Sequence, residues 1–110
     1  MERMNKMPIK IETNDGVLTA YLDGELDHHT AANAREEIDS AIDTEKPDML
    51  ILDFREITFM DSSGIGLVMG RYKKLREQGM AELHITNTSP AIYKVMKLAG
   101  LERLAKIDKC

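Results

Sequence analysis

The run Met49-Leu50-Ile51-Leu52, which follows Pro47 and leads into Asp53-Phe54, decides the fold class. A continuous apolar run of this length is typical of a strand that is covered on both faces, as in the middle of a partly parallel sheet. We therefore predict that this run is the central strand. It is separated by a loop from the glycines that begin at Gly64.

Helical patterns flank this strand, and each is marked by apolar residues at spacings of three and four. A first helix is predicted over residues 30–43, and a second begins after Asp61-Ser62-Ser63 and stops at Gly79. A further strand at residues 81–86 precedes a third helix, which Ser89 caps, Pro90 opens and Gly100 ends. The predicted apolar stripe of the second helix is Ile65, Val68, Met69, Tyr72 and Leu75.

The chain opens with a hairpin pattern, because apolar residues alternate on both sides of Asn14-Asp15-Gly16. The resulting order is ββαβαβα, and residues 101–107 add either a short strand or a helical turn. Strands joined by helices predict an α/β fold. We expect a single domain at residues 9–110, with a mixed sheet, an N-terminal hairpin and crossover helices packed on it, after a flexible N-terminus at residues 1–8.

Composition excludes several classes of function. The 110 residues carry 15 Lys and Arg against 19 Asp and Glu, and the basic residues are scattered, so no direct contact with nucleic acid is expected. Cys110 is the only cysteine, which excludes an internal disulfide and a CxxC metal or redox motif. No apolar run approaches the roughly 18 residues that cross a membrane, and no signal peptide is evident. A cytoplasmic protein without a membrane association is predicted.

Two weak patterns suggest phosphate chemistry. Gly64, Gly66 and Gly70 form GxGxxxG, which is one residue away from a dinucleotide fingerprint. The simpler interpretation is that Gly64 and Gly66 let the helix start tightly and pack closely on the sheet. Asp53 could be the phosphoacceptor of a receiver-like domain, but the paired acidic residues that hold magnesium there are missing. A strand-end carboxylate that binds local amides is the simpler interpretation for Asp53.

Asp27-His28-His29-Thr30 and Asp61-Ser62-Ser63 together offer the residue types of a hydrolase triad or a zinc site. Neither serine has the glycine two residues before it that a hydrolase elbow requires. Adjacent histidines at a helix start point in different directions and rarely share one metal, so no metal site is predicted. Asp27 and Thr30 suit helix N-capping, and the histidines are expected to be half exposed or to contact a partner.

The Asp61-Ser62-Ser63 element places two hydroxyls and a carboxylate at the start of the second helix. Asp61 or Ser62 would serve as the N-cap. A phosphate on one of the serines would add about −1.5 to −2 charge beside the positive end of the helix dipole, which the fold should tolerate. Next to Asp61 the same charge would alter a docking surface strongly. We therefore expect a surface switch with little internal rearrangement, and spacing alone does not choose between Ser62 and Ser63.

The segments Gly24-Glu25-Leu26-Asp27-His28-His29-Thr30-Ala31, Phe59-Met60-Asp61-Ser62-Ser63-Gly64-Ile65-Gly66 and Gly70-Arg71-Tyr72-Lys73 closely resemble the anti-sigma factor antagonists of the STAS family, with His-His-Thr favouring its sporulation branch. The resemblance implies a non-enzymatic partner switch without a cofactor. The unphosphorylated protein would bind an anti-sigma factor that is also a serine kinase, and so release a sigma factor. Phosphorylation from ATP and magnesium would end binding, and a metal-dependent serine phosphatase would restore it.

The resemblance also assigns roles to single residues. Ser62 would be the phosphoacceptor, Asp61 would contact the partner beside it, and Ser63 and Gly64 would shape the helix start. The residues Asp27, His28, His29 and Thr30 would border the interface. Leu67 lies off the predicted apolar stripe, so it would either be an exposed docking anchor or pack beneath the third helix or the loop after Asp27. A small receiver-like or nucleotide-binding domain is the alternative function.

Overall fold

A two-residue turn opens the fold by joining two antiparallel strands, β1 (Lys10–Asn14) and β2 (Val17–Leu26). In the computed structural model, which describes residues 9–79 and 82–109, Asp15 and Gly16 both have positive φ, +50° and +83°. Two successive positive φ angles give the turn that matches the twist of a hairpin. The predicted hairpin is confirmed, whereas the N-terminus predicted to be flexible, residues 1–8, lies outside the described residues.

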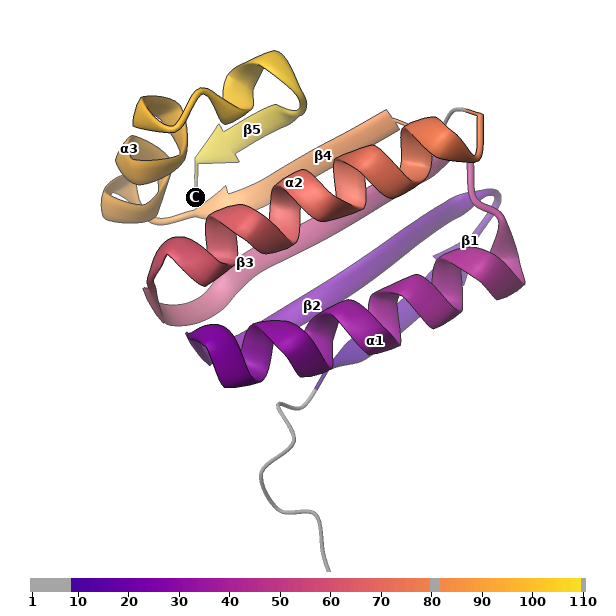
Figure 1. Ribbon diagram of the computed structural model, residues 1–110, viewed down its shortest axis with the longest axis horizontal. Coiled ribbons are helices and arrows are strands. Elements are labelled where there is room, and N and C mark those ends of the chain that lie inside the picture. The colour runs from indigo at the N-terminus through magenta and orange to yellow at the C-terminus, as the bar shows by residue number, and fades with distance from the viewer. Residues whose placement is uncertain (1–8, 80–81, 110) are drawn as a thin grey trace, which may run out of the picture.

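The remaining elements alternate between helix and strand (Figure 1). They are α1 (His28–Glu45), β3 (Met49–Met60), α2 (Ser62–Glu77), β4 (Glu82–Thr88), α3 (Pro90–Leu98), a short 3₁₀ helix η1 (Leu101–Arg103) and β5 (Lys106–Lys109). Within the described part of the chain the sheet has five strands in the order β1-β2-β3-β4-β5, and every pair after the hairpin is parallel. The predicted mixed α/β fold is confirmed. Residues 101–107 contain both a helical turn and the start of a strand.

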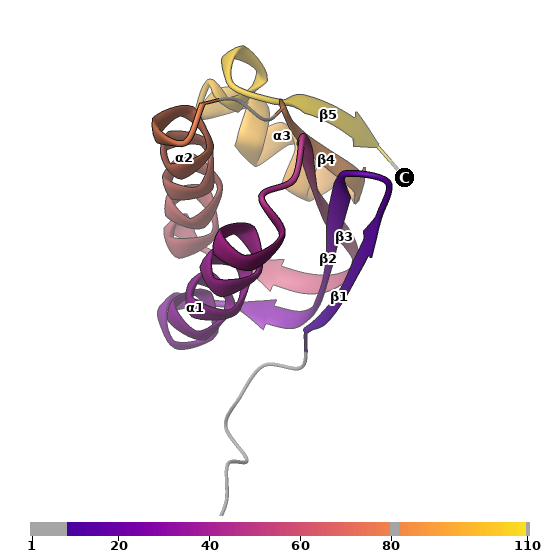
Figure 2. The same ribbon diagram turned by 90° about the vertical axis from the view of Figure 1, so that its right-hand side faces the viewer.

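The core lies between the sheet and two helices. Figure 2 shows α1 and α2 together against one face of the sheet. Alternate strand residues point to that face and are buried, as the two-residue period of a strand requires. They include Leu18, Ala20 and Leu22 on β2, Leu50, Leu52 and Phe54 on β3, and Leu83 and Ile85 on β4. Met49 and Ile51 point the other way and are half-buried, so the prediction of a strand covered on both faces is wrong for that side.

The central strand is also longer than the sequence predicts, and the expected loop before the glycines does not form. β3 continues to Met60 because its second half pairs with the end of β2, where Glu25 lies opposite Phe59. An irregularity in register places the successive charged residues Arg55 and Glu56 in solvent. Because of this break in alternation, the hydrophobic periodicity of the sequence does not reveal the second half of the strand. The consequence is that β2 and β3 end side by side.

Candidate functional site

Two helix N-termini meet at the carboxyl ends of β2 and β3. Leu26 and Met60, the last residues of these strands, are register partners, and the backbone N–H of Asp61 donates to the Leu26 carbonyl at 3.2 Å. Each strand is followed by one aspartate and then by a helix. α1 and α2 therefore start beside each other (Figure 1). This arrangement brings together the segments 27–30 and 61–64 that the sequence singles out.

The first N-terminus is a complete capping box. Asp27 Oδ1 accepts hydrogen bonds from the backbone N–H groups of His29 and Thr30 at 3.0 and 3.1 Å. In return the Asp27 N–H donates to Thr30 Oγ1 at 2.9 Å. The Thr30 backbone hydrogen bond, more than any other contact, lowers the pKa of the Asp27 carboxyl below its ordinary value. The predicted capping role of Asp27 and Thr30 is confirmed.

Asp27→Ala is expected to lower the melting temperature, because it removes the acceptor of two helix N–H groups. Asp27→Asn is the control, since it keeps an oxygen acceptor without the charge. The folded pKa lies below the unfolded value of about 3.9, so the carboxylate's contribution is complete above that value and is lost as pH falls through the folded pKa. Thermal unfolding from neutral to acidic pH should show wild type losing its advantage over Asp27→Asn. A difference in melting temperature between wild type and Asp27→Asn that stays constant with pH would contradict this prediction.

The second N-terminus presents the two serines differently. Asp61 is the N-cap of α2, and its Oδ1 accepts from the Ser63 N–H at 2.7 Å. Ser62 is the first helical residue and is exposed, whereas Ser63 is half-buried. The hydroxyl at position 62 is therefore the more accessible one, a distinction that spacing alone does not make.

Gly64 fits a close approach between α2 and the strands. A Cβ atom there would lie only 2.5 Å from Met60 Sδ and 3.1 Å from Leu26 Cδ2, so a side chain would force the Met60 side chain or the helix start to shift. The predicted packing role is confirmed for Gly64. It is wrong for Gly66, because a Cβ there would meet nothing within 4 Å.

The two histidines lie at the start of α1, in the positions that the serines occupy in α2. His28 and His29 are exposed, and their ring centroids are 4.1 Å apart. Within residues 9–79 and 82–109, no three His, Cys, Asp or Glu side chains gather closely enough to hold a metal ion. The arrangement offers a polar surface beside Ser62.

Leu67 is not an exposed anchor. Only 4% of its surface is exposed, so of the two alternatives that the sequence leaves open for Leu67, the packed one holds and the exposed anchor does not. α2 packs against both the sheet and α1, which widens its buried face beyond the stripe read from the sequence. Met69, assigned to that stripe, is 48% exposed instead, and seven residues place it two turns from Ser62 on the same side of the helix. Phe59, 50% exposed in the strand that precedes Ser62, is a second apolar surface residue that periodicity missed.

The Asp53 carboxylate accepts hydrogen bonds from neighbouring groups of the fold. Its Oδ2 accepts from Asn87 Nδ2 at 2.8 Å and from Thr86 Oγ1 at 3.3 Å, and its Oδ1 accepts from the Arg55 N–H at 2.9 Å. These contacts join β3 to the end of β4 at the irregular part of the strand. They match the simpler interpretation of a strand-end carboxylate that binds local groups.

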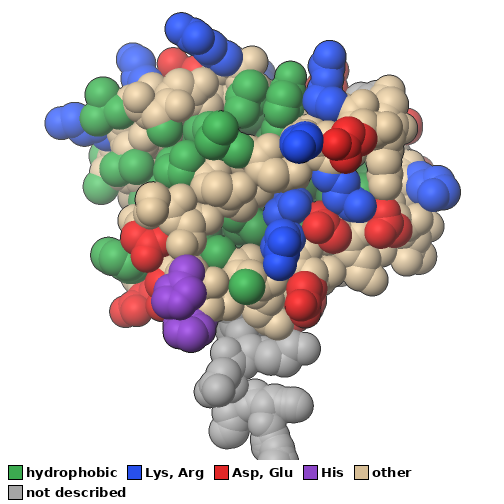
Figure 3. All heavy atoms as spheres, viewed as in Figure 1, with side chains coloured by type: hydrophobic (Ala, Val, Ile, Leu, Met, Phe, Trp, Pro, Cys, Tyr) green, Lys and Arg blue, Asp and Glu red, His purple; other side chains and the backbone are tan. Residues whose placement is uncertain are grey.

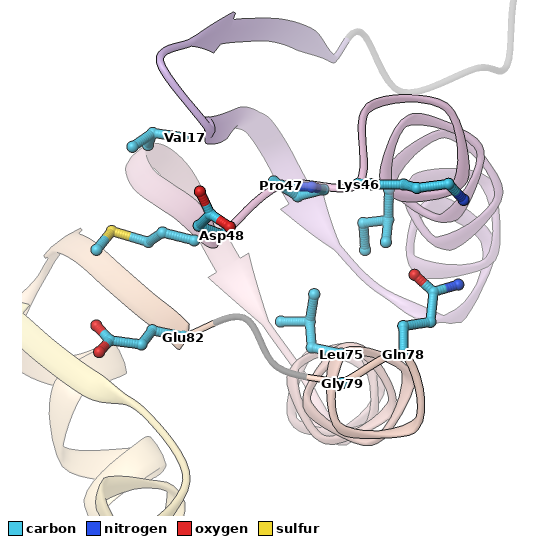
Figure 4. A pocket seen from close by; sticks show the side chains of 10 residues that line it. Val17, Lys46, Pro47, Asp48, Leu75, Gln78, Gly79 and Glu82 are labelled. Atoms are coloured by element: carbon cyan, nitrogen blue, oxygen red, sulfur yellow. The ribbon is translucent and has the colours of Figure 1, made fainter.

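A hollow of about 860 Å³ lies at the opposite end of the sheet, where β2 and β3 begin (Figure 4). Its walls include Val17, Lys46, Asp48 and Leu75. Val17 and Leu26 are the two ends of β2, so this hollow is a strand length away from Ser62. It contributes nothing to the site at the helix N-termini.

None of the helices in the described part of the chain is both long and apolar enough to span a membrane.

Comparison with known proteins relates this site to one family. The family model of the STAS domain matches residues 8–109. The anti-sigma F factor antagonist of Paenibacillus polymyxa is 35% identical over 101 residues, which cover 92% of this chain and 86% of that relative. The unphosphorylated form of the anti-sigma factor antagonist SpoIIAA superposes with a TM-score of 0.77 at 33% identity, covering 91% of this chain and 87% of that one.

The phosphorylated form of SpoIIAA, a Bacillus cell fate determinant, superposes with a TM-score of 0.71 at 33% identity, over 91% of this chain and 90% of that one. The fold, the pair of capped helix starts and these matches agree with the resemblance carried by the Asp-Ser-Ser-Gly and Gly-Glu-Leu-Asp-His-His-Thr segments. The chain belongs to the STAS domain family.

Proposed function

We propose that this protein is an anti-sigma factor antagonist that is switched by phosphorylation of Ser62. The unphosphorylated form binds an anti-sigma factor, which thereby releases its sigma factor. The relatives that support this function carry the name of anti-sigma factor antagonist, and one similar structure is of a phosphorylated form. The chain acts as a binding protein in the cytoplasm, where transcription takes place.

The observation that carries the proposal is the exposed Ser62 hydroxyl at the first position of α2, directly after the Asp61 cap. A kinase can reach this hydroxyl without unfolding the helix. The added phosphate carries about −1.5 to −2 charge and lies at the positive end of the helix dipole, so the helix tolerates it. The change in charge therefore acts on the partner more than on the fold.

The surface around Ser62 has the mixed character of a docking site. Phe59 and Met69 are exposed apolar side chains on either side of Ser62 in the sequence, and the polar His28 and His29 lie at the neighbouring helix start. In Figure 3 the histidines lie at the edge of this face near the start of α1, and hydrophobic side chains cover much of the surface towards α3. Exposed apolar anchors surrounded by polar residues are typical of protein interfaces.

The modifying enzymes in this proposal are separate proteins. The anti-sigma factor is itself a serine kinase that uses ATP and magnesium, and a metal-dependent serine phosphatase removes the phosphate. This chain is their substrate and supplies no catalytic group.

The test is intact-mass spectrometry with site mapping after incubation with ATP, magnesium and the anti-sigma factor kinase of the same organism. We expect one phosphate on wild type and on Ser63→Ala, and none on Ser62→Ala. Binding of Ser62→Ala to the same kinase with ADP shows that the variant still docks. A phosphate that maps to Ser63, or a wild-type protein that neither binds nor is modified, would contradict the proposal.

A further inference from the structure

A groove of about 430 Å³ runs between the first halves of α1 and α2, next to the proposed phosphorylation site. Gly66, Leu67 and Gly70 line it from α2, and His28, Ala32 and Arg35 line it from α1. Ser63 also lines the groove, so its mouth is one residue from Ser62. The groove is thus continuous with the surface on which the partner is proposed to dock.

Folding does not explain the two glycines in this groove. Gly66 and Gly70 lie inside α2, where glycine is less favourable than alanine because it loses more conformational freedom. Neither residue has a positive φ, and a Cβ on either would meet nothing within 4 Å. A side chain at either position would instead project into the groove. The glycines keep the groove open, which matters only if something occupies it.

The charges in the groove are unbalanced. Deeper along the same helix pair, Arg71 Nε lies 2.8 Å from Asp39 Oδ1, and Lys74 Nζ lies 3.0 Å from Asp43 Oδ1. One turn nearer the N-terminus of α1 lies Arg35, and the α2 residues that line the groove with it include Gly66 and Gly70 but no acid. Among the residues that the structure describes, Arg35 has no hydrogen-bond or ion-pair partner.

Because Arg71 is paired with Asp39, the groove carries one positive charge without a counter-charge, that of Arg35, on a protein of net charge −4. The lining residues include two arginines and one histidine but no aspartate or glutamate. Arg71 is 5% exposed. Burial is the main cause that lowers the pKa of its guanidinium, and the like charge of Arg35 lowers this pKa further. Figure 3 shows Arg and Lys side chains along the line between the helices, with Asp and Glu side chains beside them. An occupant that carries negative charge complements this site.

We propose that an acidic segment of the anti-sigma factor lies in this groove, with a carboxylate against Arg35 and its backbone over Gly66 and Gly70. This inference rests on the proposed function and specifies which surface the partner uses. It also supplies a physical reason for release. A phosphate on Ser62 would stand at the mouth of the groove and repel the incoming carboxylate.

Affinity for the anti-sigma factor kinase with ADP, measured by titration calorimetry, tests the groove. We expect Gly70→Leu and Arg35→Glu each to weaken binding at least tenfold. The matched controls are Ser40→Leu, which adds the same side chain at an exposed position of α1 outside the groove, and Arg103→Glu, which changes net charge equally at an exposed position on η1. Both controls should bind within twofold of wild type. The Arg35→Glu defect should shrink at high salt, unlike the Gly70→Leu defect.

The melting temperature of each variant distinguishes a loss of docking from a loss of folding. Gly70→Leu should not lower the melting temperature of the protein. Wild-type affinity in both groove variants would overturn this inference while leaving the proposed function intact. Failure of the wild-type protein to bind would overturn the proposed function and this inference together.

Cross-linking identifies the occupant. Glu36→Cys, at an exposed position beside Arg35 that does not line the groove, is labelled with a benzophenone maleimide in a Cys110→Ser background and should cross-link to a peptide of the anti-sigma factor that contains Asp or Glu. A cross-link to a peptide without acidic residues, or to a second copy of this chain, would overturn the proposal.

Discussion

Replacement of Ser62 by aspartate is expected to weaken binding of the anti-sigma factor about 100-fold, equivalent to about 2.8 kcal/mol, with little change in melting temperature. The new carboxylate follows Asp61 directly, so two negative charges stand where the unmodified surface has one. Like charges brought against a partner cost up to several kcal/mol. The helix itself does not resist the change, because a negative charge in the first turn of α2 interacts favourably with its dipole.

Calorimetric titration of the variant with the anti-sigma factor and ADP gives the affinity, and thermal unfolding gives the stability. Ser62→Asn is the matched control, because it has nearly the size of aspartate without the charge, and we expect it to bind within a few-fold of wild type. Equal weakening in Ser62→Asn and Ser62→Asp would assign the effect to size and argue against an electrostatic switch. A large fall in melting temperature would show that the charge acts on the fold.

The fold could be predicted from the sequence because its strongest local signals agree with each other. The run Met49-Leu50-Ile51-Leu52 marks the central strand, and Asp15-Gly16 supplies the positive φ angles of the hairpin turn. Ser89-Pro90 opens α3 as expected, with Ser89 Oγ accepting from the Ile92 N–H at 3.2 Å. Signals of this kind depend on a few neighbouring residues, which explains their reliability. The second half of β3 could not be predicted from the local sequence, because its pairing with β2 is a long-range property.

The candidate site was predictable only in part. The N-cap residues Asp27 and Asp61 are local features, and each helix starts directly after its cap, although α1 starts two residues before the predicted position 30. The apolar pattern places Met69 in the buried stripe, which is wrong, and leaves Leu67 open between exposure and burial, because a helix stripe gives no information on how many neighbouring elements cover it. The i, i+7 spacing between Ser62 and Met69 is the signal that could have found the exposed apolar residue. Arg35 and the groove depend on the packing of α1 against α2, which no local pattern reports.

Asp39→Ala is expected to lower the free energy of unfolding by about 2 kcal/mol, because it leaves the buried Arg71 guanidinium without its counter-charge. Arg71 Nε lies 2.8 Å from Asp39 Oδ1, although the two atoms do not meet hydrogen-bond geometry. Asp39 is partly exposed, so water and salt reduce the effect below the roughly 3–5 kcal/mol found for fully buried pairs. Chemical denaturation monitored by circular dichroism measures the change.

The same helix pair offers a matched control and a double-mutant cycle. Asp43→Ala removes the more exposed ion pair with Lys74 and should destabilise the chain less than Asp39→Ala does. Arg71→Met removes the buried charge while keeping an apolar stem, so Asp39→Ala in that background should have almost no effect. Additive losses in the double variant would mean that Asp39 stabilises α1 by itself. A coupled pair would mean that this ion pair fixes α2 against α1, and with it the width of the groove beside Ser62.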